Sequence, residues 1–206
     1  MSITTLYSLL APVYDPLRPL WATRLAGGVE RCLEWEILPR TLPPDATMLD
    51  LGCGTGANLA RLHRLGLCFR RYVGLDLTGA MLRRHAGWRD GERIGLVHSN
   101  AYRLPFATGT FDCVLTTWMV SHILTPRWVV DEALRVLRPG AYLVMVGYAW
   151  PSGLARLPLT LAERTLRMRC LRPAEVRTWP GLVDLRLFAG GTNALALLKS
   201  PEATLN

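Results

Sequence analysis

The feature best suited to ligand chemistry is a glycine-rich run, MLDLGCGTG, at residues 48–56. It follows an apolar stretch and opens a helical pattern, and its glycines stand at alternate positions, Gly52, Gly54 and Gly56. Glycine allows a backbone to approach a ligand closely, as it does in the loops that bind dinucleotides. The third step of the GxGxxG spacing is missing, so the loop predicts a nucleotide-like cofactor without showing which one.

The aspartate two residues before the first glycine indicates the kind of cofactor. A dinucleotide presents a pyrophosphate to the helix that follows such a loop, and the carboxylate of Asp50 would repel it. S-adenosylmethionine carries an ammonium and a sulfonium group instead, and a nearby carboxylate favours both. We therefore predict that S-adenosylmethionine, rather than NAD, is bound by Asp50 and by the loop around Cys53.

Polar residues after the second and third apolar runs are placed to hold a nucleoside. Asp76 ends the second run, and its carboxylate can accept hydrogen bonds from both ribose hydroxyls. The alternative is that Asp76 is an N-terminal charge for the helix that Thr78 caps. Asn100 and Ala101 follow the third run, where the asparagine oxygen can accept from the exocyclic amine of adenine and the Ala101 amide can donate to a ring nitrogen. Further cofactor contacts are expected from Leu77, Tyr102 and Thr117.

A methyl acceptor would lie after the fourth apolar run. His122 is the candidate general base, because it follows that run at the carboxyl edge of the predicted sheet. In-line displacement at a methyl group can also proceed by positioning and exclusion of water alone, in which case His122 is a packed or helix-capping histidine. Trp118 and Met119 are expected to wall the acceptor pocket.

Arginines alternate with leucines between Leu157 and Arg172, in the segment expected to cover the acceptor. Arg164 and Arg167 are the candidate substrate contacts there. A basic amphipathic helix of this kind can bind an anionic group or lie on an anionic membrane. The alternative is a solvated helix face in an arginine-rich protein.

The elements that must position these residues alternate between strands and helices. Expected strands are Thr47–Leu51, Tyr72–Leu77, Ile94–Ser99, Phe111–Thr117 and Ala141–Tyr148, and the expected helices are 56–65, 78–87, 125–138 and 154–178. Val183–Ala189 and Ala194–Lys199 read as a closing hairpin. Near-continuous apolar strands predict a doubly wound α/β fold with a mostly parallel, seven-stranded sheet and an antiparallel C-terminal hairpin.

We expect one domain over residues 1–206, which the pattern divides into three parts. Residues 1–44 are a helical segment, expected to form a lid over the cofactor, and a connector, with Pro12, Pro16 and Pro19 breaking the first half of the segment. Residues 45–150 form the cofactor-binding half, in which the first helix should bury Leu59 and Leu62 and expose Arg61 and Arg64. Residues 151–206 supply the acceptor-side helix and the hairpin.

Composition limits the remaining possibilities. The net charge is +8, and Lys199 is the single lysine among 24 basic residues, so the excess of arginine favours anionic partners without naming one. Five cysteines without a CxxC spacing indicate neither a metal site nor a disulfide framework, which suits a reducing, cytoplasmic setting. The longest uncharged run, residues 139–155, is broken by glycine and proline and predicts a buried strand rather than a membrane span.

Four segments, LDLGCGTG, VGLDLT, NAYRLPFATGTFDCVLTTWMVSHI and LRVLRPGAYLVMVG, follow one another in an order that resembles the class I methyltransferases. Over residues 45–148 the chain is similar to the branch with ubiquinone/menaquinone-biosynthesis methyltransferases and small bacterial phospholipid N-methyltransferases. The N-terminal APVYD also resembles a segment of that branch whose tyrosine sits by the cofactor, and Tyr14 is the match. Asn100 replaces a commoner aspartate, and VSHI at 120–123 replaces an Arg-Asn-Val signature, which argues against a quinone acceptor.

The resemblance implies methyl transfer from S-adenosylmethionine to a small acceptor that is lipophilic or anionic, either a phospholipid head group or a quinone-like ring. It leaves room for peripheral contact with an anionic membrane and leaves the oligomeric state open. A nucleic-acid methyltransferase is a less favoured alternative, because TTWM at 116–119 replaces the Asn/Asp-Pro-Pro-aromatic motif of amino-methylating enzymes. A cofactor-binding protein without turnover is the third hypothesis.

Overall fold

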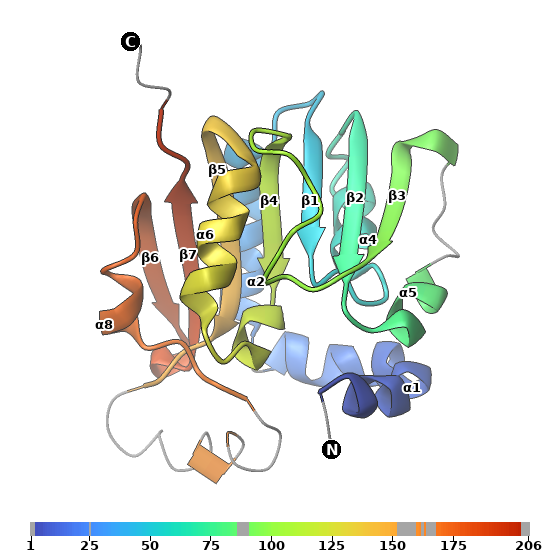
Figure 1. Cartoon of the computed structure of the whole chain (residues 1–206). Coiled ribbons are helices and arrows are strands. Elements are labelled where there is room, and N and C mark those ends of the chain that lie inside the picture. The colour runs from blue at the N-terminus through green and yellow to red at the C-terminus, as the bar shows by residue number, and fades with distance from the viewer. Residues whose placement is uncertain are drawn as a thin grey trace.

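The computed structural model describes residues 3–24, 26–85, 91–151, 160–161, 163 and 168–202. Its centre is a seven-stranded sheet with the strand order β3-β2-β1-β4-β5-β7-β6 (Figure 1). The strands are β1 (Thr47–Leu51), β2 (Arg71–Asp76), β3 (Ile94–His98), β4 (Phe111–Thr117), β5 (Leu137–Tyr148), β6 (Leu182–Phe188) and β7 (Asn193–Lys199). Pairings from β3 to β5 are parallel, and β7 is antiparallel to both of its neighbours. The predicted fold class is confirmed.

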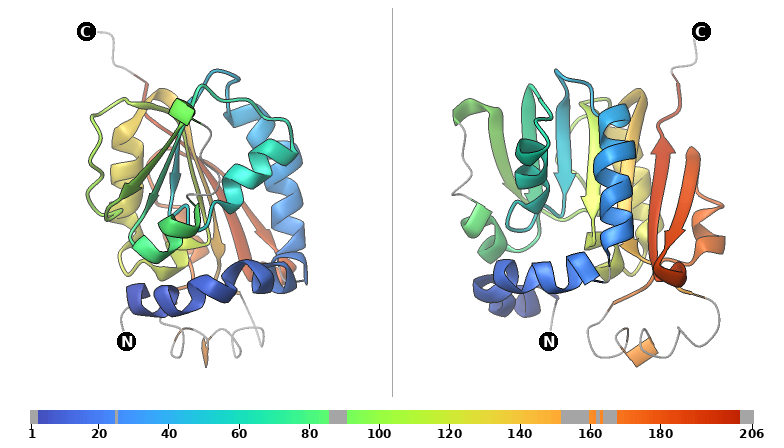
Figure 2. Two further views of the ribbon diagram at one scale, coloured as in Figure 1. Left: turned by 90° about the vertical axis from the view of Figure 1, so that its right-hand side faces the viewer. Right: turned by 180° about the vertical axis from the view of Figure 1, so that it is seen from behind.

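Helices cover both faces of this sheet (Figures 1 and 2). The α-helices are α1 (Ile3–Arg24), α2 (Gly27–Cys32), α3 (Leu38–Thr41), α4 (Ala57–Arg64), α5 (Gly79–His85), α6 (Pro126–Val136) and α8 (Pro173–Val176). A π-helical turn, η1 (Leu33–Ile37), joins α2 to α3, and short turns of 3-10 helix are η3 (Gly91–Arg93), η4 (Met119–His122) and η6 (Ala189–Gly191). Of the helices in the described ranges, none is long and apolar enough to cross a membrane.

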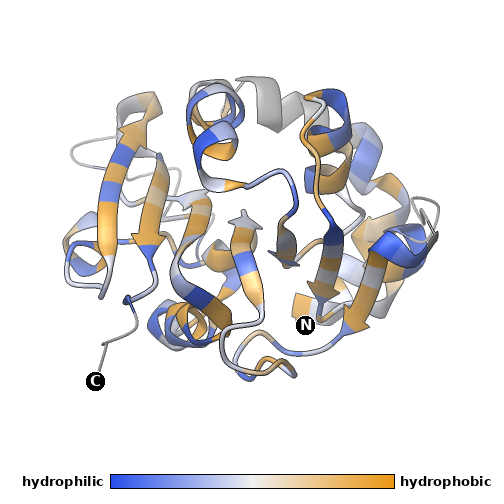
Figure 3. Ribbon diagram, turned by 90° about the horizontal axis from the view of Figure 1, so that it is seen from above, coloured by the Kyte–Doolittle hydropathy of each residue, from blue (hydrophilic) through white to orange (hydrophobic). Residues whose placement is uncertain are grey.

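Two apolar cores follow from the alternation of side chains along the strands. Leu49 and Leu51 of β1 pack toward α6, whereas Met48 packs toward α2 and α4. Coloured by hydropathy, the strands are mainly hydrophobic between helices that carry hydrophilic residues (Figure 3). Because Asp50 alternates with its neighbours, it lies on the same face of the sheet as Met48, under the α2 and α4 side.

The N-terminal helix corrects one expectation. Pro12, Pro16 and Pro19 do not break it, since α1 runs without interruption from Ile3 to Arg24. A proline inside a helix leaves unpaired the carbonyl four residues earlier, which is that of Ser8 for the first proline. Both Ser8 and Pro12 are exposed, so water can satisfy these carbonyls and the helix persists.

The first helix after the glycine loop corrects a second expectation. Leu59 and Leu62 are buried and Arg64 is exposed, as predicted. Arg61 was expected to face outward, but its side chain is only 4% exposed. Two glutamates, one in α2 and one in η1, pair with it and allow its charge to be buried.

Candidate active site

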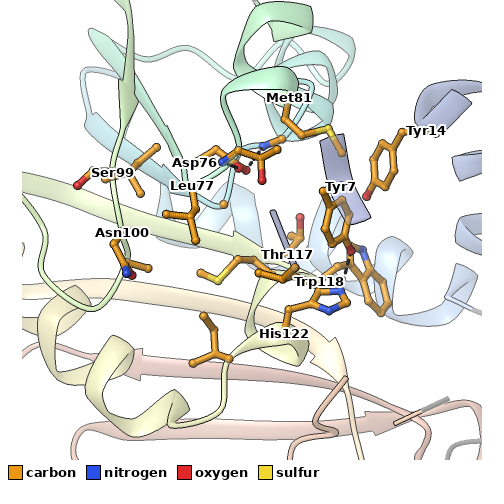
Figure 4. A pocket seen from close by; sticks show the side chains of 18 residues that line it. Tyr7, Tyr14, Asp76, Leu77, Met81, Ser99, Asn100, Thr117, Trp118 and His122 are labelled. Carbon is orange, nitrogen blue, oxygen red and sulfur yellow. Dashed lines mark hydrogen bonds between the residues drawn. The ribbon is translucent and has the colours of Figure 1, made fainter. Parts of the chain in front are cut away.

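A cavity with about 780 Å³ of space between its walls, part of it open to solvent, lies at the carboxyl ends of β1, β2 and β4 and is lined also by α1 (Figure 4). The chain leaves β1 toward β2 and β3 and then returns across it to β4, so the strand order reverses at this place. Ligands of doubly wound folds bind at such a reversal point.

Most of the residues predicted for the site do line this cavity. From the predicted cofactor set these are Tyr14, Gly52, Gly54, Asp76, Leu77, Asn100, Ala101 and Thr117, and from the acceptor set Trp118, Met119 and His122. The predicted residues that are not in the lining are Asp50, Cys53, Gly56 and Tyr102. Sequence reasoning missed Ile3, Tyr7, Leu75, Thr78, Met81, Ser99 and Ile123.

Each of the three glycines of the loop meets a different structural requirement. All have positive φ, of +76°, +54° and +94° in chain order, which side chains rarely adopt. A Cβ at Gly52 would come within 2.4 Å of the Met119 side chain, and one at Gly56 within 2.9 Å of the His85 ring. Around Gly54 nothing lies within 4 Å of that position, so this glycine leaves an open cradle that faces the cavity.

Asp76 ties this cradle to the end of β2. Its Oδ2 accepts from the Gly54 amide at 2.9 Å and its Oδ1 from the Thr78 amide at 2.7 Å. Each oxygen keeps a lone pair for a further donor, as two ribose hydroxyls would supply. Burial raises the pKa of this carboxyl, and the two amide bonds oppose that effect. The open cradle and the carboxylate together fit a nucleoside that carries a positively charged side chain.

Asp50 lies below the cavity instead of facing it. It is fully buried, accepts from Tyr72 Oη at 2.6 Å and from Asn58 Nδ2 at 2.9 Å, and so has both oxygens engaged by the protein. Burial raises its pKa to about 6, although these two hydrogen bonds act in the opposite direction. Its charge can reach a ligand only through the loop above it. Cys53 is also buried, with its sulfur close to Gly74.

The end of the cavity beyond β3 is suited to a base. Ser99, Asn100 and Ala101 line it together with Leu77, whose side chain is 42% exposed (Figure 4). The Asn100 oxygen accepts from the Tyr102 amide at 3.0 Å, which closes a turn and fixes the side chain. Tyr102 thus shapes this end of the cavity from behind instead of lining it.

At the other end, the phenol oxygen of Tyr7 lies 2.7 Å from Nε2 of His122 (Figure 4). Burial lowers the pKa of His122 to about 4, so the ring is neutral at physiological pH. Burial also raises the pKa of Tyr7, which keeps the phenol protonated. Tyr7 donates to Nε2 when the neutral ring carries its hydrogen on Nδ1, and accepts from Nε2–H in the other tautomer. Nδ1 is buried and has no hydrogen-bond partner among the described residues.

Helix α1, the lid that carries Tyr7, is held in place by an aspartate of its own. Asp15 accepts from Thr55 Oγ1 at 2.5 Å and from the Arg84 guanidinium at 3.1 Å. Thr55 belongs to the glycine loop and Arg84 to α5, so one carboxylate fastens α1 to both walls of the cofactor end. The tyrosine beside it, Tyr14, lies in the lining as the APVYD segment predicts.

The basic segment is only partly defined. Arg164 and Arg167, predicted to contact the substrate, lie outside the described residues. Arg169 is described, and its guanidinium bonds Glu175 at 3.0 Å and the carbonyl oxygen of Leu124 at 2.5 Å. Over the described ranges, no cluster of three His, Cys, Asp or Glu side chains is placed to hold a metal ion.

Comparison with known proteins agrees with this geometry. A family model described as a methyltransferase domain matches residues 49–145. A demethylmenaquinone methyltransferase of Clavibacter sepedonicus is 34% identical over 134 residues, which are 63% of this chain and 51% of that protein. The chain spans about half the length of the curated relatives it matches.

Two solved structures share the fold at low identity. Phosphoethanolamine N-methyltransferase 2 of Haemonchus contortus, in complex with S-adenosyl-L-methionine, has a TM-score of 0.68 and 16% identity, over 82% of this chain and 52% of that one. The cyclase SpnF has a TM-score of 0.69 and 17% identity, over 83% of this chain and 80% of that one. Residues 49–145 therefore match a methyltransferase domain, and the chain has the fold of the class I, S-adenosylmethionine-dependent methyltransferases.

Proposed function

We propose that this protein transfers a methyl group from S-adenosylmethionine to a small, neutral, lipophilic acceptor, a ring that carries a hydroxyl group. The observation that carries the proposal is the hydrogen bond between Tyr7 and His122, at an end of the cavity that carries no formal charge at neutral pH. Trp118, Met119 and Ile123 supply flat and flexible apolar walls around that pair. Such a site suits a ring and offers its hydroxyl the phenol of Tyr7 as a polar partner.

The charge of the cavity supports a neutral acceptor over an anionic one. Among the described residues that line it, Asp76 carries the only formal charge at neutral pH, because His122 is neutral there. A phosphate group would need arginine or lysine donors close by. The described lining contains neither, so a phospholipid head group is the weaker of the two acceptors that the sequence suggested.

S-adenosylmethionine supplies an electrophilic methyl group on a sulfonium. The residues around it position the acceptor and handle its proton. With the histidine hydrogen on Nδ1, the acceptor hydroxyl would donate to Tyr7 Oη and Tyr7 would pass its own hydrogen to Nε2 of His122, which would make the acceptor more nucleophilic. His122 would gain a positive charge, and the cofactor, when bound, would supply the compensating loss of charge from its sulfonium. The net charge of the buried site is thereby preserved, which offsets the weak basicity of the histidine.

An assay that follows labelled methyl groups into three candidate acceptors tests this proposal. Purified protein receives cofactor with a labelled methyl group together with naphthohydroquinone, with vesicles of phosphatidylethanolamine and phosphatidylglycerol, or with RNA. We expect label in the naphthohydroquinone fraction. Label in the lipid or RNA fraction would overturn the acceptor class, and a bound cofactor with no transfer to any of them would favour a non-methylating role, as the fold of a cyclase permits.

A further inference from the structure

Trp118 adopts a backbone conformation that its residue type does not favour. Its φ of 67° and ψ of −21° lie in the left-handed region, where a residue with a Cβ is disfavoured. Its amide nevertheless donates to the Val146 carbonyl at 2.7 Å, and its ring lies 5.1 Å from that of Tyr148. Strained backbone of this kind persists where surrounding contacts enforce it, commonly at functional sites.

One of the contacts that hold Trp118 is made by a residue outside the cavity lining. The indole Nε1 of Trp118 donates a hydrogen bond at 3.1 Å to Oε1 of Glu30, which lies in helix α2. The second oxygen of Glu30 pairs with the guanidinium of Arg61, a side chain that is 4% exposed. A single carboxylate thus connects the wall of the cavity to a buried charge on α4.

The buried arginine is itself held on several sides. Nε of Arg61 donates to Glu34 at 3.1 Å, and another of its nitrogens donates to the side-chain oxygen of Asn58. Asn58 in turn donates to Asp50 at 2.9 Å and to Thr117 Oγ1 at 3.1 Å. The chain of bonds therefore runs beneath the cavity from the glycine-loop side to Trp118. Buried ion pairs add little net stability but restrict geometry.

We propose that Glu30, fixed by Arg61, is a positioning residue that sets the orientation of the Trp118 indole and thereby the shape of the acceptor end. Trp118 lines the cavity together with Tyr7 and His122, and in the view of Figure 4 Asn100 is at the opposite side of the cavity. Loss of Glu30 should therefore weaken acceptor binding and leave cofactor binding unchanged. The expected effect on the acceptor rests on the proposed function, because it assumes that a ring binds against this wall.

The chain offers a closely matched control. Glu30 and Glu34 both pair with Arg61, and each side chain is 13% exposed. Only the Glu30 carboxylate also accepts from Trp118, whereas Glu34 bonds Arg64 instead. Glu30→Gln and Glu34→Gln remove equivalent charges from the same cluster, so a difference between them reports the contact with the indole.

The indole N–H resonance of Trp118 tests the positioning claim without any acceptor. The protein has seven tryptophans, and Trp118→Phe assigns the resonance by deleting it. We expect Glu30→Gln to move it upfield, because the indole loses a hydrogen bond to a charged group, and Glu34→Gln to leave it in place. Equal movement in both variants, or none in Glu30→Gln, would overturn the proposal.

Calorimetry then tests whether the orientation of the Trp118 indole affects acceptor binding. For Glu30→Gln we expect the Kd of naphthohydroquinone to rise about tenfold, as for loss of a hydrogen bond to a charged group, with the Kd of S-adenosylhomocysteine unchanged. In a Trp118→Phe background the same change should have no further effect. An additive effect there, or equal losses for both ligands, would show that Glu30 is merely structural. If the wild-type protein does not bind naphthohydroquinone, the acceptor class is wrong, and the resonance alone decides the role of Glu30.

Discussion

Tyr7 and His122 are 115 positions apart in the sequence, yet the phenol oxygen of one lies 2.7 Å from Nε2 of the other. The rings meet edge to face, with centroids 5.2 Å apart. The contact joins the lid helix α1 to the turn that follows β4, and it closes the cavity at the end opposite to the base-binding residues. One contact therefore both holds α1 over the cavity and forms the proposed proton path.

The histidine of this pair should titrate far below an exposed one. Burial lowers the pKa of His122 to about 4 from the usual 6.5, so its protonated fraction should become appreciable only near pH 4. Two-dimensional NMR of the four histidines, with His122→Gln to assign the resonance, measures this directly. A titration midpoint near that of free histidine would show that the His122 ring is solvated. His122 would then not be the neutral base that the proposed mechanism requires.

Asp76 should control affinity for the cofactor. Its replacement by alanine removes charge-assisted hydrogen bonds of about 1.5–3 kcal/mol each, so affinity for S-adenosylmethionine should fall at least about tenfold. Asp112→Ala is the matched control, because that carboxylate also accepts a backbone amide, from Thr47, but at the opposite edge of the sheet. Calorimetry that finds equal affinities for wild type and Asp76→Ala would exclude Asp76 from the site.

Asp50 should make the free energy of unfolding depend on pH in a distinctive way. Its pKa is 3.8 when unfolded and about 6 when folded, so the folded state holds the proton more tightly. Stability is therefore lost as pH rises from about 4 to about 6, where folding must bury the ionised carboxylate. Asp50→Asn lacks this loss, so its unfolding free energy relative to wild type should increase over that interval. Urea unfolding at several pH values tests this, and a constant difference between the two proteins would contradict it.

The lid should be separable from the core. The described residues of both apolar cores begin at Ala26, so removal of residues 1–20 should leave a folded sheet. The same deletion removes Tyr7, Tyr14 and the Asp15 fastening, and we expect much weaker binding of S-adenosylhomocysteine and no methyl transfer. Circular dichroism checks the fold and calorimetry the affinity. Full activity in the truncated protein would mean that α1 only packs on the surface.

Local sequence patterns predicted those parts of the site that one strand and its following loop provide. The glycine loop, Asp76 and the pair Asn100–Ala101 each follow a strand that the apolar pattern identifies, and parallel strands bring their carboxyl ends together. For this reason their place in the cavity could be expected from the chain order alone. The mostly parallel sheet follows from the alternation of strands and helices, and the closing hairpin from two apolar runs joined by a short turn.

Contacts between distant segments could not be predicted in this way. Tyr7 has no motif, and its pairing with His122 depends on how α1 crosses the edge of the sheet. Asp50 has the residue type of a ligand contact, but the alternation of strand side chains turns it into the α2 and α4 face. Arg61 has the spacing of an exposed residue, and only the glutamates of α2 and η1 make its burial possible.

The most direct test of the account is the rate of a single methyl-transfer turnover by Tyr7→Phe, with naphthohydroquinone as acceptor. This change keeps the ring that packs against His122 and removes only the hydroxyl that relays the proton. We predict a rate about a hundredfold or more below that of wild type, the contribution typical of general acid–base catalysis, with affinity for S-adenosylhomocysteine unchanged. A rate equal to that of wild type at the same pH would contradict the proposed role of the Tyr7–His122 pair.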